Sequence, residues 1–174
     1  MSLKTVFEKG LVLARYQMFS QVYFHKVRRI YDYHSREAIK AILTAKGYEN
    51  GIYPAPVNIN DYLELDDWAV YAALRDGLGG KHGEIWLKRS HYKCIESTKD
   101  IPTAEELANI KKLQEEHAET GYFLDEASAK WYSHDKDVSI LLDNGNVQRL
   151  SKKSNIVKSM VDTKMQRFYV PRQN

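Results

Sequence analysis

The longest amphipathic pattern in the chain covers residues 11–36, where apolar side chains recur every three or four positions. This spacing predicts a helix, because about 3.6 residues complete one helical turn. One face of this helix would carry Arg15, Phe19, Val22, Lys26, Arg29 and Tyr33, with Tyr23 at its edge. The opposite face would carry Leu13, Phe24 and Tyr31, so the helix is apolar nearly all round and is expected to lie inside a domain. Cations on a buried helix need acidic neighbours or an anionic ligand.

The same helical pattern begins near Lys4 and runs to Lys46, with Gly10 as a candidate kink. Gly47 is a typical residue for a helix C-terminus. A loop rich in glycine and proline follows, and Asp66 then has the chemistry of a helix N-cap. Further helical stretches are therefore expected at residues 61–76 and 84–91.

The pattern changes after residue 91. Thr103 and Glu106 have the spacing of a capping box, which predicts a helix ending at Gly121. Its inward residues would be Leu107, Ile110 and Leu113. The other expected elements are strands at 92–97, within 122–132 and at 166–170, a hairpin of 138–142 with 147–150, and a helix at 155–161 capped by Ser154.

These elements predict a mainly α protein with a small α+β part. Residues 1–91 would form a helical segment led by one long helix, and residues 92–174 a small α+β subdomain with a β-hairpin.

Two strings within the first helix resemble a known family. They are Ala-Arg-Tyr-Gln-Met-Phe at residues 14–19 and Val-Tyr-Phe-His-Lys at residues 22–26. They resemble the helix that follows the catalytic core in HD-domain phosphohydrolases, the dGTPase-like deoxynucleoside triphosphate triphosphohydrolases and their bacterial relatives. Leu-Asp-Asp at 65–67 and Tyr-Val-Pro at 169–171 match the family in the same order. The family's metal motif would lie before residue 1, so the resemblance is to the C-terminal half.

The resemblance implies roles for three residues. Arg15 would contact triphosphate oxygens and Tyr23 would pack against the nucleotide sugar, and a guanidinium group suits phosphate. Lys26 matches a lysine that meets regulatory nucleotide phosphates at a subunit interface. The alternatives are an internal Arg–carboxylate pair, a core tyrosine, and a solvated basic face or ion pairs with Asp32 and Glu37 for Lys26.

No catalytic residue, metal ligand or cofactor is expected within this chain. The intact enzyme would use a divalent metal such as Mn, Mg or Fe to activate water. The doublet His134–Asp135 lies in a predicted polar loop, and its upstream partner would be His117 near a helix end, so we expect no metal site there. Cys94, the single cysteine, is expected to be a buried, inert thiol. A lone cysteine excludes an intramolecular disulfide and fits a reducing cytoplasm.

The composition of the chain limits which kinds of binding partner are expected. Lysine plus arginine number 26 against 23 for aspartate plus glutamate, and a net charge of +3 is too small to indicate nucleic acid by itself. Residues 15–46 are more basic, with seven cations against two carboxylates, or +5. No apolar run reaches the roughly 18 residues of a membrane span, and no signal peptide follows Met1.

The sequence therefore predicts the C-terminal portion of a cytoplasmic (deoxy)nucleotide phosphohydrolase that is not catalytically competent alone. Its partners would be the missing N-terminal HD core, a nucleoside triphosphate and further copies in a homo-oligomer. Two alternatives remain open at this point. One is a nucleic-acid-binding module that uses the basic helix and its tyrosines, and the other is an oligomerisation or interaction module.

Overall fold

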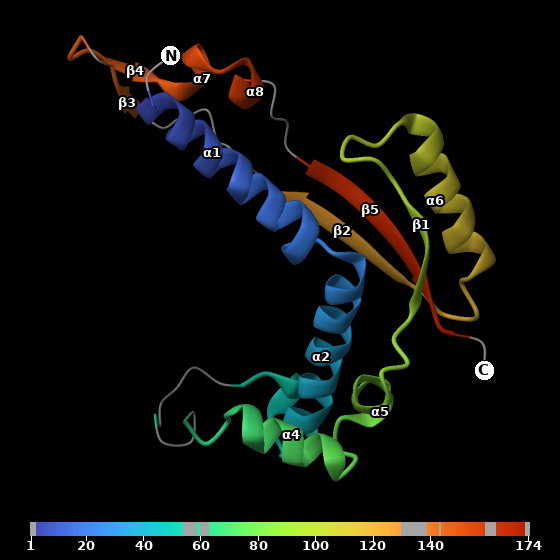
Figure 1. Cartoon of the computed structure of the whole chain (residues 1–174). Helices are drawn as coiled ribbons and strands as arrows, with labels where there is room; N and C mark the ends of the chain where they lie inside the picture. Colours follow the sequence, from blue (N-terminus) through green and yellow to red (C-terminus); the bar gives the residue numbers. More distant parts are fainter. Residues whose placement is uncertain are drawn as a thin grey trace. The chain divides into compact units, whose positions relative to one another are not determined.

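The computed structural model describes residues 3–53, 59, 63–129, 139–142, 144–158 and 163–172. The fold is mainly helical with a small antiparallel sheet part, which confirms the predicted fold class (Figure 1). Two compact units divide the chain: a sheet unit of residues 1–26 and 94–170, and a helical unit of residues 27–93 and 171–174. These units differ from the predicted division at residue 91. The N-terminal residues join the sheet unit, where Val12 packs against a core of Ile140, Leu150 and Val157.

The predicted long helix is interrupted, and the interruption is not at Gly10. Helix α1 (Leu3–Met18) passes through Gly10 and continues into a π-helical turn, η1 (Phe19–Tyr23), and helix α2 (Lys26–Ala45) begins after it. The N–H of Phe24 donates to the carbonyl of Phe19 at 2.8 Å, a bond that spans five residues instead of four. This change of hydrogen-bond register ends the first helix.

The prediction that this stretch is buried all round is wrong. In α2 the buried side chains Ile30, His34, Ala38 and Ile42 recur every four residues on one face, and Leu43 beside them is also buried. The predicted face is mostly at the surface instead, because Arg15, Val22, Tyr23 and Lys26 are exposed. Residues 10–18 of α1 include no buried side chain, so the buried face of this stretch lies in α2.

The helical unit is built on the buried face of α2. Ala38 and Ile42 form a core with Ala73 and Leu74 of α4 (Asp67–Arg75), against which Trp86 of α5 (Gly80–Lys88) also packs. Helix α4 begins as predicted, since the side chain of Asp66 accepts the N–H of Ala69 at 2.8 Å. Helix α5 begins earlier than residue 84. A Cβ at Gly83 would lie 2.9 Å from Leu74 Cδ2, so glycine allows α5 to approach α4 closely.

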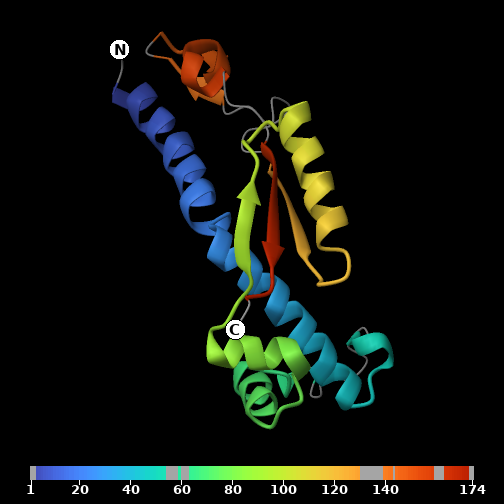
Figure 2. The ribbon, with the colours of Figure 1, turned by 90° about the vertical axis from the view of Figure 1, so that its right-hand side faces the viewer.

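The sheet unit contains a three-stranded sheet in the order β1 (Lys93–Ser97), β5 (Thr163–Val170), β2 (Phe123–Ala129). Strands β2 and β5 are antiparallel. Helix α6 (Ala104–Glu116) lies against this sheet (Figure 2) and opens with the predicted capping box, in which Thr103 Oγ1 accepts the N–H of Glu106 at 3.2 Å. Ile110 is buried as predicted, but Leu107 is 36% exposed, and the helix ends at the cap residue His117 before Gly121.

The rest of the sheet unit is a small subassembly around the predicted hairpin. Strands β3 (Ser139–Leu141) and β4 (Val147–Arg149) are antiparallel, and the short helices α7 (Leu150–Lys153) and α8 (Asn155–Lys158) follow. Ser154 Oγ accepts the N–H of Val157 at 3.4 Å, which confirms it as the cap. Within the described part of the chain, no helix combines the length and apolar composition that crossing a bilayer requires.

Two of the glycines in the helical unit, both near the end of α2, differ in their surroundings. Gly47 (φ +87°) and Gly51 (φ +64°), the last residue of the 3-10 turn η2 (Glu49–Gly51), both have left-handed backbone. A Cβ at Gly47 would meet nothing within 4 Å, whereas a Cβ at Gly51 would overlap the Lys40 carbonyl oxygen and lie 2.9 Å from Thr44 Oγ1. The turn therefore packs directly on α2.

We expect Gly47→Ala to lower the free energy of unfolding by about 1 kcal/mol, which is the cost of left-handed backbone for alanine. Gly51→Ala should cost about 2–4 kcal/mol, because overpacking is added to the same backbone term. Urea unfolding of both variants beside the unchanged chain measures the difference. Equal losses in the two variants would contradict the close packing of Gly51 on α2.

Candidate functional site

The residues predicted to contact substrate lie around η1 in the sheet unit. The π turn adds a residue to one helical turn, which brings Phe24 beside Phe19 with ring centroids 6.2 Å apart. The rings of Phe19 and Tyr23 are 5.0 Å apart. A π turn within an α-helix frequently coincides with a functional site. Here it gathers aromatic side chains that a regular helix would space differently.

Arg15 joins this aromatic group from the last turn of α1. Its guanidinium carbon lies 5.3 Å from the centre of the Phe19 ring, which is a cation–π contact. Among the residues that the structure describes, no carboxylate lies within ion-pair distance of Arg15, and its side chain is exposed. Tyr23 is 39% exposed. The site therefore presents a cationic group and an aromatic face to solvent.

Lys26 lies just beyond η1, and its backbone anchors the segment. The buried hydroxyl of Tyr169 on β5 donates to the Lys26 carbonyl oxygen at 3.0 Å. Burial, together with Cys94 nearby, raises the pKa of Tyr169 far above its usual range, so the hydroxyl keeps its proton. The Lys26 side chain is exposed. A hydrogen bond thus holds the backbone at the end of the site, while the Lys26 side chain is exposed to solvent.

A buried ion pair occupies the sheet beside this anchor. Asp125 of β2 stands opposite Arg167 of β5, and Asp125 Oδ2 lies 4.0 Å from Arg167 Nη1. Both side chains are buried. Cys94 is half-buried and donates to the Glu96 carbonyl at 3.3 Å, and burial raises the pKa of its thiol. A thiol with a raised pKa is a poor nucleophile at neutral pH, although Cys94 is only half-buried where a buried thiol was predicted.

The helical unit contains a separate histidine group. His34 is fully buried, and its Nε2 accepts the N–H of Tyr92 at 3.3 Å. Since Nε2 is an acceptor, Nδ1 carries the proton and donates to Nδ1 of His82 at 2.8 Å. Burial is the largest cause that lowers the pKa of His34 to about 4, and the neighbouring groups His82, His91 and Lys81 contribute to the same shift. His34 is therefore a neutral structural residue at pH 7.

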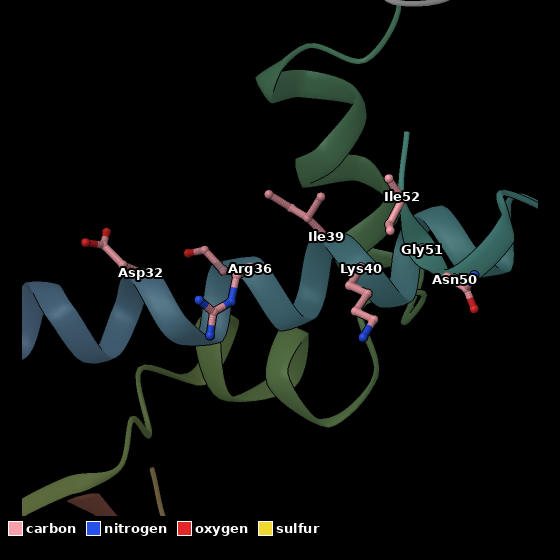
Figure 3. Close-up of a pocket in the computed structure, with 8 residues that line it drawn as sticks. Asp32, Arg36, Ile39, Lys40, Asn50, Gly51 and Ile52 are labelled. Carbon is pink, nitrogen blue, oxygen red and sulfur yellow. The ribbon is translucent and has the colours of Figure 1, made fainter. Parts of the chain in front are cut away.

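A groove of about 650 Å³ lies along the exposed face of α2 in the same unit. Its wall consists of Asp32, Ser35, Arg36, Ile39 and Lys40, together with residues 50–52 at the turn η2. Figure 3 shows the side chains of Arg36 and Lys40 pointing to the same side of α2, with Asn50 beyond Lys40. The sequence indicated local positive charge here. It held no signal for the groove, which depends on the packing of Gly51 against α2.

The predicted site residues are thus only partly brought together. Arg15 and Tyr23 both contact Phe19, while Lys26 lies at the far end of the same segment. The doublet His134–Asp135 lies outside the described residues. Within the described ranges, no three side chains of metal-binding type lie close enough together to hold an ion. Sequence reasoning missed the contacts of His34 with His82 and Tyr92, because these join residues far apart in the chain.

Comparison with known proteins identifies the family to which the chain belongs. A family model described as "HD associated region" matches residues 8–170, which is nearly the whole chain. No curated protein sequence matches the chain.

Two solved structures are similar over almost all of the chain. A hypothetical protein from Aquifex aeolicus has 26% sequence identity and a TM-score of 0.79, over 98% of this chain and 43% of that one. A phosphohydrolase from Bacteroides thetaiotaomicron VPI-5482 has 17% identity and a TM-score of 0.63, over 94% of this chain and 49% of that one. The chain therefore spans less than half the length of either protein.

The buried imidazole of His34 predicts a pH dependence of stability. Its pKa is about 4 when folded against 6.5 for a free histidine, so the unfolded state binds the proton first as the pH falls. Stability should therefore decrease from about pH 6.5 to pH 4, with about 3 kcal/mol due to this group. The measurement is urea unfolding at pH 7.5 and pH 4.5, with His34→Gln compared with His25→Gln. We expect the pH effect to shrink only in His34→Gln; an equal effect in both variants would assign it to other groups.

Proposed function

Because the chain belongs to the family of HD associated regions, we propose that it is the accessory part of a nucleotide phosphohydrolase and supplies contacts to the substrate phosphates and sugar. The similar structure from Bacteroides thetaiotaomicron that is named a phosphohydrolase supports this reaction class. Deoxynucleoside triphosphates are the substrates that the sequence resemblance favours. The proposal gives this chain a binding role and leaves bond cleavage to a separate HD part.

The observation that carries the proposal is the environment of Arg15. A structural arginine would be expected to pair with a carboxylate, yet the described residues offer this one only an aromatic ring. A guanidinium group that is exposed and oriented by a ring is ready to bind phosphate oxygens in a bidentate manner. Arg15 is therefore proposed as the phosphate contact.

Tyr23 is proposed as the sugar contact. It lies one helical turn beyond Phe19 on the same segment, and its ring is partly open to solvent. An aromatic ring packs well against the apolar face of a sugar, and the hydroxyl needs no role in this contact. Lys26 is proposed as a contact for the phosphates of a regulatory nucleotide, since its ammonium group is exposed while its backbone is anchored by Tyr169.

The proposed partner is the HD part of the enzyme, in a homo-oligomer. Large apolar side chains on α1 and η1 support this, since Leu11 is 73% exposed and Val22 is 50% exposed. Exposed apolar groups that lie on one segment commonly mark a protein interface. The divalent metal of the reaction does not fit the described residues, which contain no cluster of suitable ligands, so it is assigned to the HD part.

The 174-residue chain alone should not hydrolyse nucleoside triphosphates. The reason is that bond cleavage in this proposal needs a metal that the HD part holds. Each dNTP is incubated with the chain and Mn²⁺ or Mg²⁺, and released phosphate is measured. Turnover by the chain that disappears in His134→Ala would instead place a metal site at the His134–Asp135 doublet.

In the assembled enzyme, Arg15→Ala should lower kcat/KM by roughly ten- to a hundredfold, because a charged hydrogen bond to phosphate contributes about 1.5–3 kcal/mol. Its melting temperature should hardly change, since an exposed cation–π contact contributes about 0.5–1 kcal/mol. Arg28→Ala is the matched control, because it removes an exposed arginine whose pair with Asp32 at 3.8 Å contributes little. A large loss of melting temperature with unchanged kinetics would make Arg15 structural.

Tyr23→Phe and Tyr23→Ala separate the ring from the hydroxyl. We expect the phenylalanine variant to retain nearly all activity and the alanine variant to raise KM for the nucleotide. Equal effects of the two variants would show that the hydroxyl, not the ring, makes the contact.

A further inference from the structure

The groove along α2 adjoins a second groove in the helical unit. The second has a volume of about 340 Å³ and is lined by Tyr71 and Trp86, among other apolar residues. Ser35 and Ile39 line both grooves, so the two form one continuous surface across α2. Volumes of roughly 300–1,000 Å³ are typical of small-molecule sites.

The chemistry changes from one end of this surface to the other. At about 100° per residue, the order around α2 is Ser35, Ile39, Asp32, Arg36 and Lys40. The Ser35 side borders the aromatic groove, and the Lys40 side is basic. A ligand that lies across the helix would meet an aromatic surface first, then an aliphatic side chain and a carboxylate, and finally two cations.

The two cations have unused binding capacity. Arg36 engages Glu37 through Nε at 3.4 Å, and its guanidinium lies 5.7 Å from the Tyr33 ring centre. These contacts leave both terminal nitrogens of Arg36 without a partner among the described residues, and the same holds for Lys40 Nζ. Two cations one helical turn apart on the same side of α2 (Figure 3) can bind one phosphate group together.

The aromatic end is also preorganised. The rings of Tyr71 and Trp86 meet edge to face with centroids 5.9 Å apart, and Trp86 is held against the core of Ala38 and Leu74. Such a fixed aromatic wall favours a flat apolar ring. Asp67 at this groove can accept a hydrogen bond from a ring N–H or amino group.

From these features we infer that the surface across α2 is a nucleotide-binding site. The base would lie against Tyr71 and Trp86, and the phosphates would bind Arg36 and Lys40. The sugar would cross Ile39, where Asp32 can accept a hydrogen bond from a hydroxyl group. The residues of this site belong to the helical unit, and none of them is among the substrate contacts proposed above.

Fluorescence of Trp86 tests the site directly. The chain has three tryptophans, and Trp68→Phe with Trp131→Phe leaves Trp86 alone. Titration of this 174-residue protein with ATP should give saturable quenching, and adenosine or inorganic triphosphate should each bind at least about tenfold more weakly. Arg36→Ala with Lys40→Ala should weaken ATP at least about tenfold and leave adenosine unchanged. Tyr71→Ala should weaken ATP and adenosine by the same factor.

The matched control is Lys111→Ala with Lys112→Ala, which removes two neighbouring cations from α6 and should leave ATP binding unchanged. Arg15→Ala should also leave the quenching unchanged, so failure at this site and failure at the substrate contacts are told apart. Circular dichroism confirms that each variant is folded.

Three results would overturn the inference. They are no quenching of Trp86, an equal loss of affinity in the Lys111/Lys112 control, and equal affinity for triphosphate and ATP. Saturable quenching of Trp86 by an acidic amphipathic peptide, with no binding of ATP, would assign the surface to a protein partner instead.

Discussion

The long N-terminal helical stretch contributes side chains to two separate hydrophobic cores. The π turn η1 lies between the part that packs in one core and the part that packs in the other. Val12 packs into the core of the sheet unit, while Ile30, His34, Ala38 and Ile42 face the interior from α2. The bond from Phe24 N–H to the Phe19 carbonyl ends one helix, and the bond from the Tyr169 hydroxyl to the Lys26 carbonyl holds the start of the next. The aromatic group around Arg15 is a product of this interruption, since it forms where the helical register changes.

Local signals in the sequence predicted most of the elements. The capping box at Thr103, the cap at Asp66 and the hairpin were all found, because each depends on residues within a few positions of one another. The interruption at η1 was missed, because the apolar spacing through residues 11–36 is continuous and favours one helix. The prediction of which face of α2 is buried was also wrong. The buried face is the one that packs against Ala73 and Leu74, which lie more than thirty positions away in the sequence.

The candidate sites show the same division. Arg15, Tyr23 and Lys26 were predicted as site residues from a resemblance to a family, and the contact of Arg15 with Phe19 could have been inferred from their spacing of four residues. The basic groove on α2 could not be predicted from the sequence, because Arg36 and Lys40 have the spacing of an ordinary solvated helix face. Arg36 and Lys40 line a groove because the turn at Gly51 packs against α2. Gly51 has no side chain, so its backbone can approach the helix closely.

The buried ion pair Asp125–Arg167 helps to determine the register between β2 and β5. A shift of β5 by one residue against β2 would turn its buried side chains to the other face. A shift by two residues keeps the face, and the apolar neighbours Phe123, Ala127, Met165 and Tyr169 would tolerate it. That shift would, however, separate Arg167 from Asp125, and breaking a buried ion pair costs about 3–5 kcal/mol. The ion pair thus discriminates between alignments that hydrophobic packing alone would treat as nearly equivalent, and the Tyr169 hydroxyl reaches the Lys26 carbonyl only in the alignment it selects.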